Sequence, residues 1–436
     1  MRLKKLTVKN FKSLRDCEIE LGKFNVLVGA NASGKTNLVE VFKLLRKIYV
    51  ERDTNPFLEW WGYNNVVWAG KEELPITVGM LFDVEGYDVY FETTFTGTGG
   101  SFRILREVLE IKEHLKIEKR GKFLSISYSP AWFEKALKKL PPHIENRLFE
   151  KISSQFHNNE YPLSEECIDI SVLDICSSME GVYSQDKTVA YSLCYPLGFH
   201  EHAFPLMSPV MILNKNTMTP MHLEVPVRLR QFFRGLTLRQ ISVRTAKTPQ
   251  YPRKETTLSE DASNLVPLLY NIWLREGRLP DEIAKPLPIA FPNTRVFFQL
   301  TEDGRVMMKV FENDLELAPP SISDGFYKIL ALLTAVYLKP PLLIIDEIEN
   351  SLHPETLELI IDTLRESESQ VIITTHSPVV VDIVEPSDLV LVDKENGETV
   401  FRRIKDPEKI KKFLNEKGIT LSEGWLYGSL FESDDQ

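Results

Sequence analysis

The first 128 residues are rich in short stretches where hydrophobic and polar residues alternate, as is typical of strands that bury one face. One short run of continuous apolar residues interrupts this alternation. Together the patterns predict strands at four places: 3–8, 24–28, 76–82 and 87–95. The last two are expected to be joined by a turn at Glu85–Gly86. A helix is predicted after the second strand, because apolar residues recur on one face between Leu38 and Ile48.

The sequence changes character between residues 129 and 255. An amphipathic stretch at 132–140 is stopped by two prolines, and the remainder is irregular and contains further prolines. No heptad pattern is sustained there, which excludes a long coiled-coil arm. We therefore expect a helical or irregular insertion at 129–255 that separates the two halves of one domain, at 1–128 and 256–436.

Residues 256–436 return to a regular pattern. Two alternating stretches, 295–300 and 305–311, flank Asp303–Gly304 and predict a hairpin. Helices then alternate with three uniformly apolar strands, predicted at 342–345, 371–375 and 389–392. Strands of this kind belong to a parallel sheet that is covered on both faces. The predicted fold class is therefore α/β, with a mixed sheet, an antiparallel β subdomain and the insertion.

Composition narrows the functional classes. The net charge of −10 over 436 residues argues against a generally basic nucleic-acid coat, so any DNA or RNA site must be local. Four cysteines form no CxxC pair, and residues 1–11 do not have the pattern of a signal peptide. No apolar stretch approaches the length of a membrane span. These features predict a cytoplasmic protein with free thiols and no membrane contact.

A glycine-rich loop stands between the predicted strand at 24–28 and the helix that follows it. Residues 29–36 match the pattern GxxxxGK[ST], and we call them the P-loop. Its backbone N–H groups and the helix N-terminus are expected to hold phosphates, with Lys35 on the β- and γ-phosphates and Thr36 on Mg²⁺. The alternative is a glycine-rich turn with a surface lysine. The predicted ATP-binding residues of this region are Gly29, Ala30, Asn31, Ala32, Ser33, Gly34, Lys35, Thr36 and Asn37.

Two acids follow the predicted strand at 342–345. A buried parallel strand delivers such carboxylates to the edge of the sheet where ligands bind. Asp346 is expected to hold Mg²⁺, and Glu347 to polarise the attacking water as a general base. Acidic residues are also favoured at the start of helices, so the pair alone does not indicate a nucleotide site. In combination with the P-loop it does.

Two further polar positions precede and follow these acids. Ser323 stands before a predicted helix, where it can cap the helix or face an anion. His376 ends the strand at 371–375, where it can donate to the γ-phosphate or be structural.

The order of these motifs resembles that of the ABC-type ATPases rather than the hexameric ring ATPases. The opening LKKLTVKNFKSL is similar to the SMC, RecF and OLD-nuclease branch of that class. The likeness continues in LSEDASNLVPLL, SDGFYKILALL, LLIIDEIENSLHP and VIITTHSP. The chain is most similar to stand-alone OLD-like ATPases, some of which serve in anti-phage defence. The resemblance covers about 1–95 and 240–436 and leaves out the middle segment.

The resemblance implies an ATP-dependent dimer. Two chains would pair head to tail around two ATP molecules, with the P-loop, Asp346, Glu347 and His376 acting within one chain. The signature residues Ser323, Asp324 and Gly325 would approach the γ-phosphate from the partner chain. Lys12 and Ser13 match the element that lines the nucleotide, and 351–353 matches a loop that crosses the interface. ATP hydrolysis would then open the dimer.

Two departures from the family pattern stand out. Asp324 occupies a position that is glycine in transporter-type signatures, and no coupling glutamine is identifiable in 70–82. Only 60 residues follow His376, so we expect any nuclease activity to belong to a separate effector chain.

The predicted function is an ATPase whose conformational switch serves DNA repair, DNA maintenance or anti-phage defence. A nucleotide-gated scaffold for an effector and, less favoured, a transporter motor are the alternatives.

A basic segment at 228–254 contains no acidic residue and includes aromatic residues. It predicts either a contact surface for DNA or RNA or a solvated face that pairs with acids elsewhere. The candidate contact residues are Arg228, Arg230, Arg234, Arg239 and Arg244.

Overall fold

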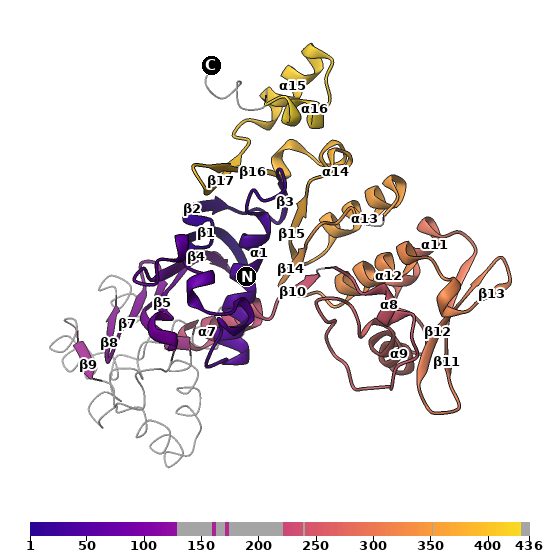
Figure 1. Cartoon of the computed structure of the whole chain (residues 1–436), viewed down its shortest axis with the longest axis horizontal. Coiled ribbons are helices and arrows are strands. Elements are labelled where there is room, and N and C mark those ends of the chain that lie inside the picture. The colour runs from indigo at the N-terminus through magenta and orange to yellow at the C-terminus, as the bar shows by residue number, and fades with distance from the viewer. Residues whose placement is uncertain (129–158, 163–170, 174–220, 239, 351, 429–436) are drawn as a thin grey trace, which may run out of the picture. The chain divides into compact units, whose positions relative to one another are not determined.

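The structure is a computed structural model of the chain, and it describes all residues except 129–158, 163–170, 174–220, 239, 351 and 429–436 (Figure 1). Most of the expected insertion, including the amphipathic stretch at 132–140, therefore lies outside the described residues.

The chain folds into two compact units. Unit 1 contains Met1–Glu20 and Glu40–Phe233, and unit 2 contains Leu21–Val39 and Arg234–Gln436. The P-loop therefore belongs to unit 2, although it lies near the N-terminus. Helix α1 (Lys35–Arg46) begins in unit 2 and continues into unit 1. The division of the sequence at 128 and 255 remains a prediction about domains.

Unit 1 is built on an antiparallel sheet in which the described strands follow the order β2-β1-β4-β5-β6-β7-β8-β9. Its strands are β1 (Arg2–Phe11), β2 (Leu14–Glu20), β4 (Ile76–Val84), β5 (Tyr87–Thr96), β6 (Arg103–Ile111), β7 (Leu115–Arg120), β8 (Phe123–Tyr128) and β9 (Asn159–Pro162). The predicted strands at 3–8, 76–82 and 87–95 lie within β1, β4 and β5. The turn between β4 and β5 uses Glu85 and Gly86, both with positive φ, as the sequence predicted.

Helix α7 (Met221–Phe233) also belongs to unit 1, and it lies within the expected helical or irregular insertion. Pro226 lies inside this helix, and a proline at such a position obscures the helical pattern in the sequence. Phe232 and Phe233 are buried at its C-terminal end and pack on the rings of Phe82 and Phe91. These two aromatic residues of the basic segment are therefore core residues, and as placed they are not available to stack on bases.

Unit 2 contains a sheet with the described strand order β10-β14-β15-β3-β16-β17. The first five strands run parallel, and β17 pairs antiparallel with β16. Its strands are β10 (Leu236–Leu238), β14 (Leu342–Ile345), β15 (Gln370–Thr375), β3 (Phe24–Val28), β16 (Leu389–Glu395) and β17 (Glu398–Arg403). The sequence predicted β3, β14, β15 and β16, and the parallel arrangement confirms the expected α/β class. It missed β10 and β17.

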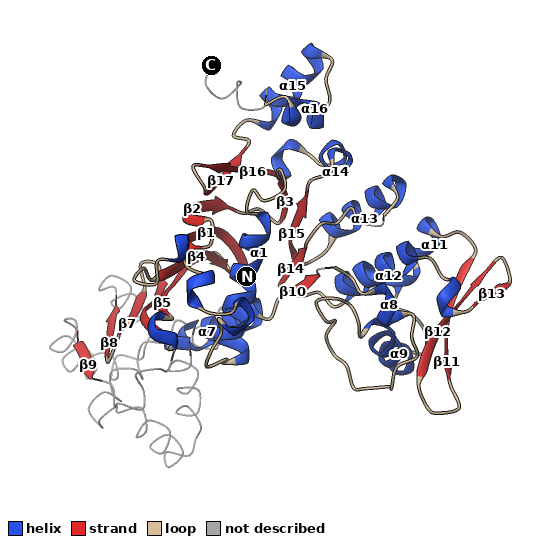
Figure 2. Cartoon of the chain, in the orientation of Figure 1, coloured by secondary structure: helices blue, strands red, loops and turns tan. Residues whose placement is uncertain are grey.

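Unit 2 also contains helices between and after its strands (Figure 2). They are α8 (Val243–Ala246), α9 (Leu265–Glu276), α10 (Asp281–Ala284), α11 (Leu287–Ala290), α12 (Asp324–Tyr337), α13 (Pro354–Glu366), α14 (Pro378–Ile383), α15 (Pro407–Lys417) and α16 (Leu421–Leu426). Helix α12 is buried almost all round, because its side chains from Phe326 to Val336 lie in the core. Its N-terminal residues Ser323 and Asp324 remain exposed.

The predicted hairpin of unit 2 is present as β11 (Thr294–Leu300) and β12 (Val306–Glu312). Its turn contains Gly304 with a positive φ. A third strand, β13 (Leu315–Leu317), pairs with β12 to complete a small antiparallel sheet.

Candidate nucleotide-binding site

The strand order brings the predicted catalytic segments together in unit 2. Strands β14, β15 and β3 are neighbours and run parallel, so their carboxyl ends meet at one edge of the sheet. Asp346 and Glu347 follow β14, His376 follows β15, and the P-loop follows β3. Residues far apart in the sequence therefore converge, as the motif order predicted.

The P-loop has the tightly curled backbone that phosphate binding requires. Ala32 and Gly34 both have positive φ, at 63° and 109°. A Cβ added to Gly29 would lie 2.1 Å from the carbonyl oxygen of Val392 on β16, so only glycine fits there. The glycines of the motif are thus dictated by the neighbouring strand and by the loop's own curvature.

Lys35 is buried in the P-loop, with 8% of its surface exposed. Its Nζ donates hydrogen bonds to the carbonyl oxygens of Gly29, at 2.7 Å, and Ala30, at 2.9 Å. Burial lowers the pKa of Lys35, while the carboxylates of Glu349, Asp346 and Glu347 oppose that shift. The ammonium group is thus held within the field of three acids and curled onto the loop that would carry the phosphates.

The hydroxyl of Ser33 is a polar group of this loop that a ligand could bind. Its Oγ is buried and has no hydrogen-bond partner within the described part of the chain. Buried polar groups are usually paired, so such a group marks a place that a ligand can complete. The backbone of Ser33 is fixed at the same time, because its carbonyl oxygen accepts from Thr399 Oγ1 at 2.8 Å.

A threonine on β15 holds both acids of the predicted catalytic pair. The buried Thr374 Oγ1 donates to Asp346 Oδ1 at 2.5 Å and accepts from the backbone N–H of Glu347 at 2.9 Å. Glu347 has a positive φ of 54°, so the chain turns sharply at this residue. Thr374 was not predicted, because its role depends on a contact between neighbouring strands.

Glu349 fixes the loop that carries His376. Its Oε1 accepts from the backbone N–H of His376 at 2.9 Å and lies 3.0 Å from the Nδ1 atom of the same residue. The second oxygen, Oε2, is buried and unpaired within the described residues. Glu349 contacts the imidazole of His376 at Nδ1, so this contact does not involve Nε2. Glu349 carried no separate sequence signal beyond its place in the DEIEN segment.

Lys328 connects helix α12 with the catalytic loop. Its Nζ donates to the carbonyl oxygen of Asn350, and the side chain of Asn350 donates to Glu347 Oε2 at 2.7 Å. Burial lowers the pKa of Lys328 to about 8, against the raising effect of Glu349 and Glu347. The helix that begins at Ser323 therefore reaches the predicted general base through two side chains.

The signature residues lie at the exposed N-terminus of α12. Ser323 is the N-cap, and its Oγ accepts from the N–H of Phe326 at 3.2 Å. The carboxylate of Asp324 pairs with Lys247 Nζ at 2.7 Å. Gly325 is half-buried behind them. Among the described residues, no hydrogen bond joins Ser323 to the P-loop, so its predicted role toward a phosphate stays a prediction.

Lys12 and Ser13 lie in unit 1. Lys12 pairs with Glu40, and its ammonium lies 5.6 Å from the centre of the Trp60 ring. Its positive φ of 47° places it in a sharp turn after β1. The part of Lys12 and Ser13 in lining a nucleotide stays a prediction. Of the expected interface loop at 351–353, residue 351 lies outside the described residues.

The residues present fit a magnesium ion that is shared with a triphosphate. Thr36 and Asp346 supply oxygen atoms, which are the ligands that Mg²⁺ prefers, and phosphate oxygens and water commonly supply the rest. No cluster of three or more His, Cys, Asp or Glu side chains able to hold a metal occurs in the described part of the chain.

The basic segment is divided between the units. Arg228 and Arg230 lie on α7 in unit 1, and Arg228 pairs with Glu85 at 2.6 Å. Arg230 also has an interaction partner. Arg234 and Arg244 are exposed in unit 2, and residue 239 lies outside the described residues. A common nucleic-acid surface formed by all five arginines stays a prediction.

Two protein-family profiles match the chain. Residues 1–96 match a profile described as "AAA ATPase domain", and this range contains the P-loop. Residues 226–382 match one described as "AAA domain, putative AbiEii toxin, Type IV TA system". The second range contains the signature residues, both acids and His376.

Both matched profiles describe AAA-type domains, and together they contain the P-loop and the second set of motifs. The profiles, the motif order and the parallel sheet all agree with the resemblance seen in the sequence. They support a nucleotide-binding ATPase.

Solved structures of SMC heads are similar to this ATPase domain. An SMC head bound to the C-winged helix domain of ScpA is 13% identical, with a TM-score of 0.49, and the match covers 94% of this chain and 100% of that chain. The SMC head of Thermotoga maritima is 13% identical, with a TM-score of 0.42 and coverages of 93% and 100%. The Smc head of Pyrococcus yayanosii is 14% identical, with a TM-score of 0.44 and coverages of 96% and 99%.

No curated protein matches the sequence. Among the described helices, none is both long and apolar enough to cross a membrane.

Thr374 gives the first test of this ATPase site. Replacing it in Thr374→Val removes the hydroxyl that holds Asp346 and Glu347, and we expect ATP turnover to fall by about tenfold to a hundredfold. ATP affinity should change less, because the P-loop is untouched. Thr374→Ser keeps the hydroxyl and should retain most activity. Steady-state kinetics would contradict this role if Thr374→Val turned over ATP like the wild type.

Lys328 gives the second test. With its pKa near 8, the side chain loses its charge as the pH rises through that value, and its link to Asn350 weakens. We expect the ATPase rate to fall on the alkaline side with an apparent pKa near 8. Lys328→Arg should keep the charge and move this fall to higher pH. The exposed Lys339→Arg serves as control. An unchanged profile in Lys328→Arg would exclude Lys328 as its origin.

Proposed function

We propose that the chain hydrolyses ATP in a head-to-tail homodimer. The P-loop holds the phosphates of one ATP, and the signature serine of the second chain completes the site. The observation that carries this proposal is the convergence of Lys35, Asp346 and Glu347 at the carboxyl ends of β3 and β14, the two parallel strands that flank β15. The carboxylates of Asp346 and Glu347 act to raise the pKa of Lys35, which agrees with this closeness.

The roles within one chain follow from chemistry and placement. Lys35 neutralises charge on the β- and γ-phosphates, and Thr36 and Asp346 hold Mg²⁺, which screens the phosphates from one another. Glu347 orients and polarises the attacking water. The amide of Asn350 on Glu347 Oε2 leaves Oε1 for that water. His376, oriented by Glu349 through Nδ1, donates to the γ-phosphate from its other nitrogen.

The signature residues act on the partner's nucleotide. Ser323 is exposed at a helix N-terminus, where the partial positive charge of the helix favours an anion. Asp324 would repel a triphosphate if its charge were unopposed. Its ion pair with Lys247 offsets that charge, which explains how this signature tolerates an acid in place of glycine.

ATP then acts as the ligand that joins two chains. A nucleotide that contacts both subunits stabilises the dimer, and loss of the γ-phosphate removes the contacts to the signature serine. The output of the cycle is therefore a change in how the two subunits are held. Lys12 and Ser13 are proposed to line the nucleotide once the site is assembled.

The biological setting is proposed from the family description. One matched profile names an AbiEii-type toxin of a type IV toxin–antitoxin system, and those words apply to that family. We place this chain in anti-phage defence or DNA maintenance, where its switch controls a separate effector. A nucleotide-gated scaffold differs from this only in lacking turnover, so catalysis by Glu347 decides between them.

Glu347→Gln separates catalysis from binding. The variant should bind ATP, accumulate as ATP-dependent dimers and lose turnover by about a hundredfold or more, because the amide cannot act as the base. Light scattering and phosphate release measure the two effects. Glu358→Gln, which changes an exposed acid on α13, should leave both at wild-type values.

The two alternatives predict different results for these variants. Wild-type turnover in Glu347→Gln would show that another group is the base. ATP-dependent dimers without turnover in the wild-type protein would support the scaffold.

A further inference from the structure

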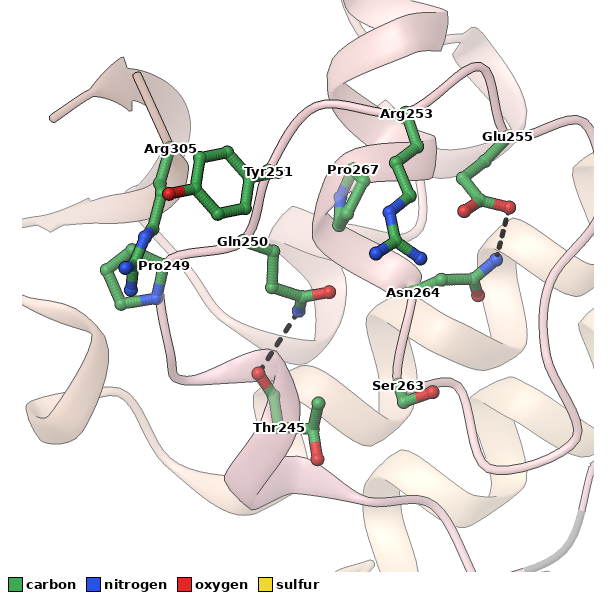
Figure 3. Close-up of a pocket in the computed structure, with 10 residues that line it drawn as sticks. All are labelled: Thr245, Pro249, Gln250, Tyr251, Arg253, Glu255, Ser263, Asn264, Pro267 and Arg305. Carbon is green, nitrogen blue, oxygen red and sulfur yellow. Dashed lines mark hydrogen bonds between the residues drawn. The ribbon is translucent and has the colours of Figure 1, made fainter. Parts of the chain in front are cut away.

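A cavity lined mainly by residues with polar side chains lies in unit 2, and the proposed ATPase mechanism does not use these residues. Its volume is about 410 Å³, within the range of sites for small organic ligands. The loop after α8, the start of α9 and the beginning of β12 form its walls. Figure 3 shows Tyr251 with Arg305 at one end, Arg253 at the other and the amide of Gln250 between them.

The end formed by Tyr251 offers a flat aromatic surface. The guanidinium of Arg305 lies 5.1 Å from the centre of the Tyr251 ring, and it also pairs with Asp303 at 2.9 Å. The tyrosine nevertheless remains 56% exposed. A large aromatic ring left open beside a cation is the arrangement on which nucleic-acid bases stack.

The end formed by Arg253 offers an unmatched positive charge. None of the ion pairs within the described part of the chain includes Arg253. The neighbouring acid, Glu255, accepts instead from the amide of Asn264 at 3.1 Å. Figure 3 shows the Arg253 guanidinium between Pro267 and Asn264, on the cavity side of its loop. An arginine fork in this position suits the oxygens of a phosphate.

The backbone that carries these groups is held in place. Gln250 exchanges two backbone hydrogen bonds with Val306, at 2.9 Å and 2.7 Å, which fixes the positions next to Tyr251 and Arg305. The side chain of Gln250 also donates to the carbonyl oxygen of Thr245 at 3.1 Å. Asn271 on α9 donates to the carbonyl oxygen of Arg253. A site prepared in this way loses little freedom when a ligand binds.

We propose that this cavity binds a nucleotide unit, with its base against Tyr251 and its phosphate on Arg253. The unit is either a free nucleoside monophosphate or one nucleotide of a single strand. An acidic peptide would use Arg253 but would leave the aromatic end of the cavity empty. The proposal concerns residues outside the ATP site, so it stands or falls separately from ATP hydrolysis.

The test uses two pairs of variants. The first pair removes a positive charge at one of two adjacent positions, and the second pair changes Tyr251. Arg253→Gln removes the cation in the cavity, and Lys254→Gln removes an exposed cation that does not line it. Tyr251→Ala removes the ring and Tyr251→Phe keeps it. The probes are a labelled single-stranded DNA of about 12 nucleotides and nucleoside 5′-monophosphates. Saturating MgADP occupies the P-loop, and a glutamate-rich peptide serves as the third probe.

We expect Arg253→Gln and Tyr251→Ala to weaken binding of a nucleotide probe by at least about fivefold. Lys254→Gln and Tyr251→Phe should change it by less than about twofold. If only the oligonucleotide responds, the ligand is part of a strand, and if only the monophosphates respond, it is a free nucleotide; either result supports the proposal.

Three results would overturn the proposal. One is the absence of binding by both nucleotide probes. Another is an equal loss of affinity in Arg253→Gln and Lys254→Gln, which would show a general charge effect. The last is Arg253-dependent binding of the acidic peptide alone. ATP turnover measured in the same variants without probe should match the wild type. The cavity proposal can therefore fail without any consequence for the proposed ATP hydrolysis.

Discussion

The two hydrogen bonds of the Thr374 hydroxyl are the interactions on which the geometry of the proposed catalytic site depends. The hydroxyl donates to the carboxylate of Asp346 and accepts from the N–H of Glu347, so one buried atom holds two consecutive acids for which we propose different roles. This is possible because β14 and β15 run parallel and in register up to their carboxyl ends. The P-loop follows β3 on the other side of β15, so the same strand that holds the acids also lies beside the phosphate cradle.

Helix α12 links the outer surface of unit 2 to this centre. Its first residues, Ser323 and Asp324, face outward, while Lys328, just over one turn further on, reaches the carbonyl oxygen of Asn350. Because Asn350 also donates a hydrogen bond to Glu347, a displacement at the N-terminus of the helix can reach the proposed general base through two side chains. This connection gives a physical reason why hydrolysis would respond to a second subunit at the signature residues.

The sequence predicted best those features that depend on neighbouring residues in the chain. Strands β3 and β14 have the bounds that their apolar runs predicted, and the P-loop glycines are explained by a curled backbone beside Val392. The residues that were missed act through contacts between distant segments. Thr374 is an ordinary strand residue and Lys328 an ordinary helix residue until the fold places them beside Glu347 and Asn350.

Other features were obscured by conflicting local signals. Helix α7 contains Pro226, which obscures the helical pattern in the sequence, but the burial of Phe232 and Phe233 stabilises it. The run of basic residues suggested one surface, yet the chain passes from unit 1 to unit 2 within it. Arg228 meets Glu85, an acid that lies more than a hundred positions earlier in the sequence. Spacing along the chain cannot reveal either fact.

The most direct measurement of the composite site is complementation between two inactive variants. Lys35→Ala should abolish nucleotide binding in its own subunit, and Ser323→Arg should block the contact to the partner's nucleotide. Each alone should be inactive, but an equimolar mixture should regain about a quarter of wild-type turnover. Random pairing makes about half of the dimers mixed, and each mixed dimer keeps one complete site. A mixture as inactive as its components, with ATP still bound by Ser323→Arg, would contradict catalysis across the dimer.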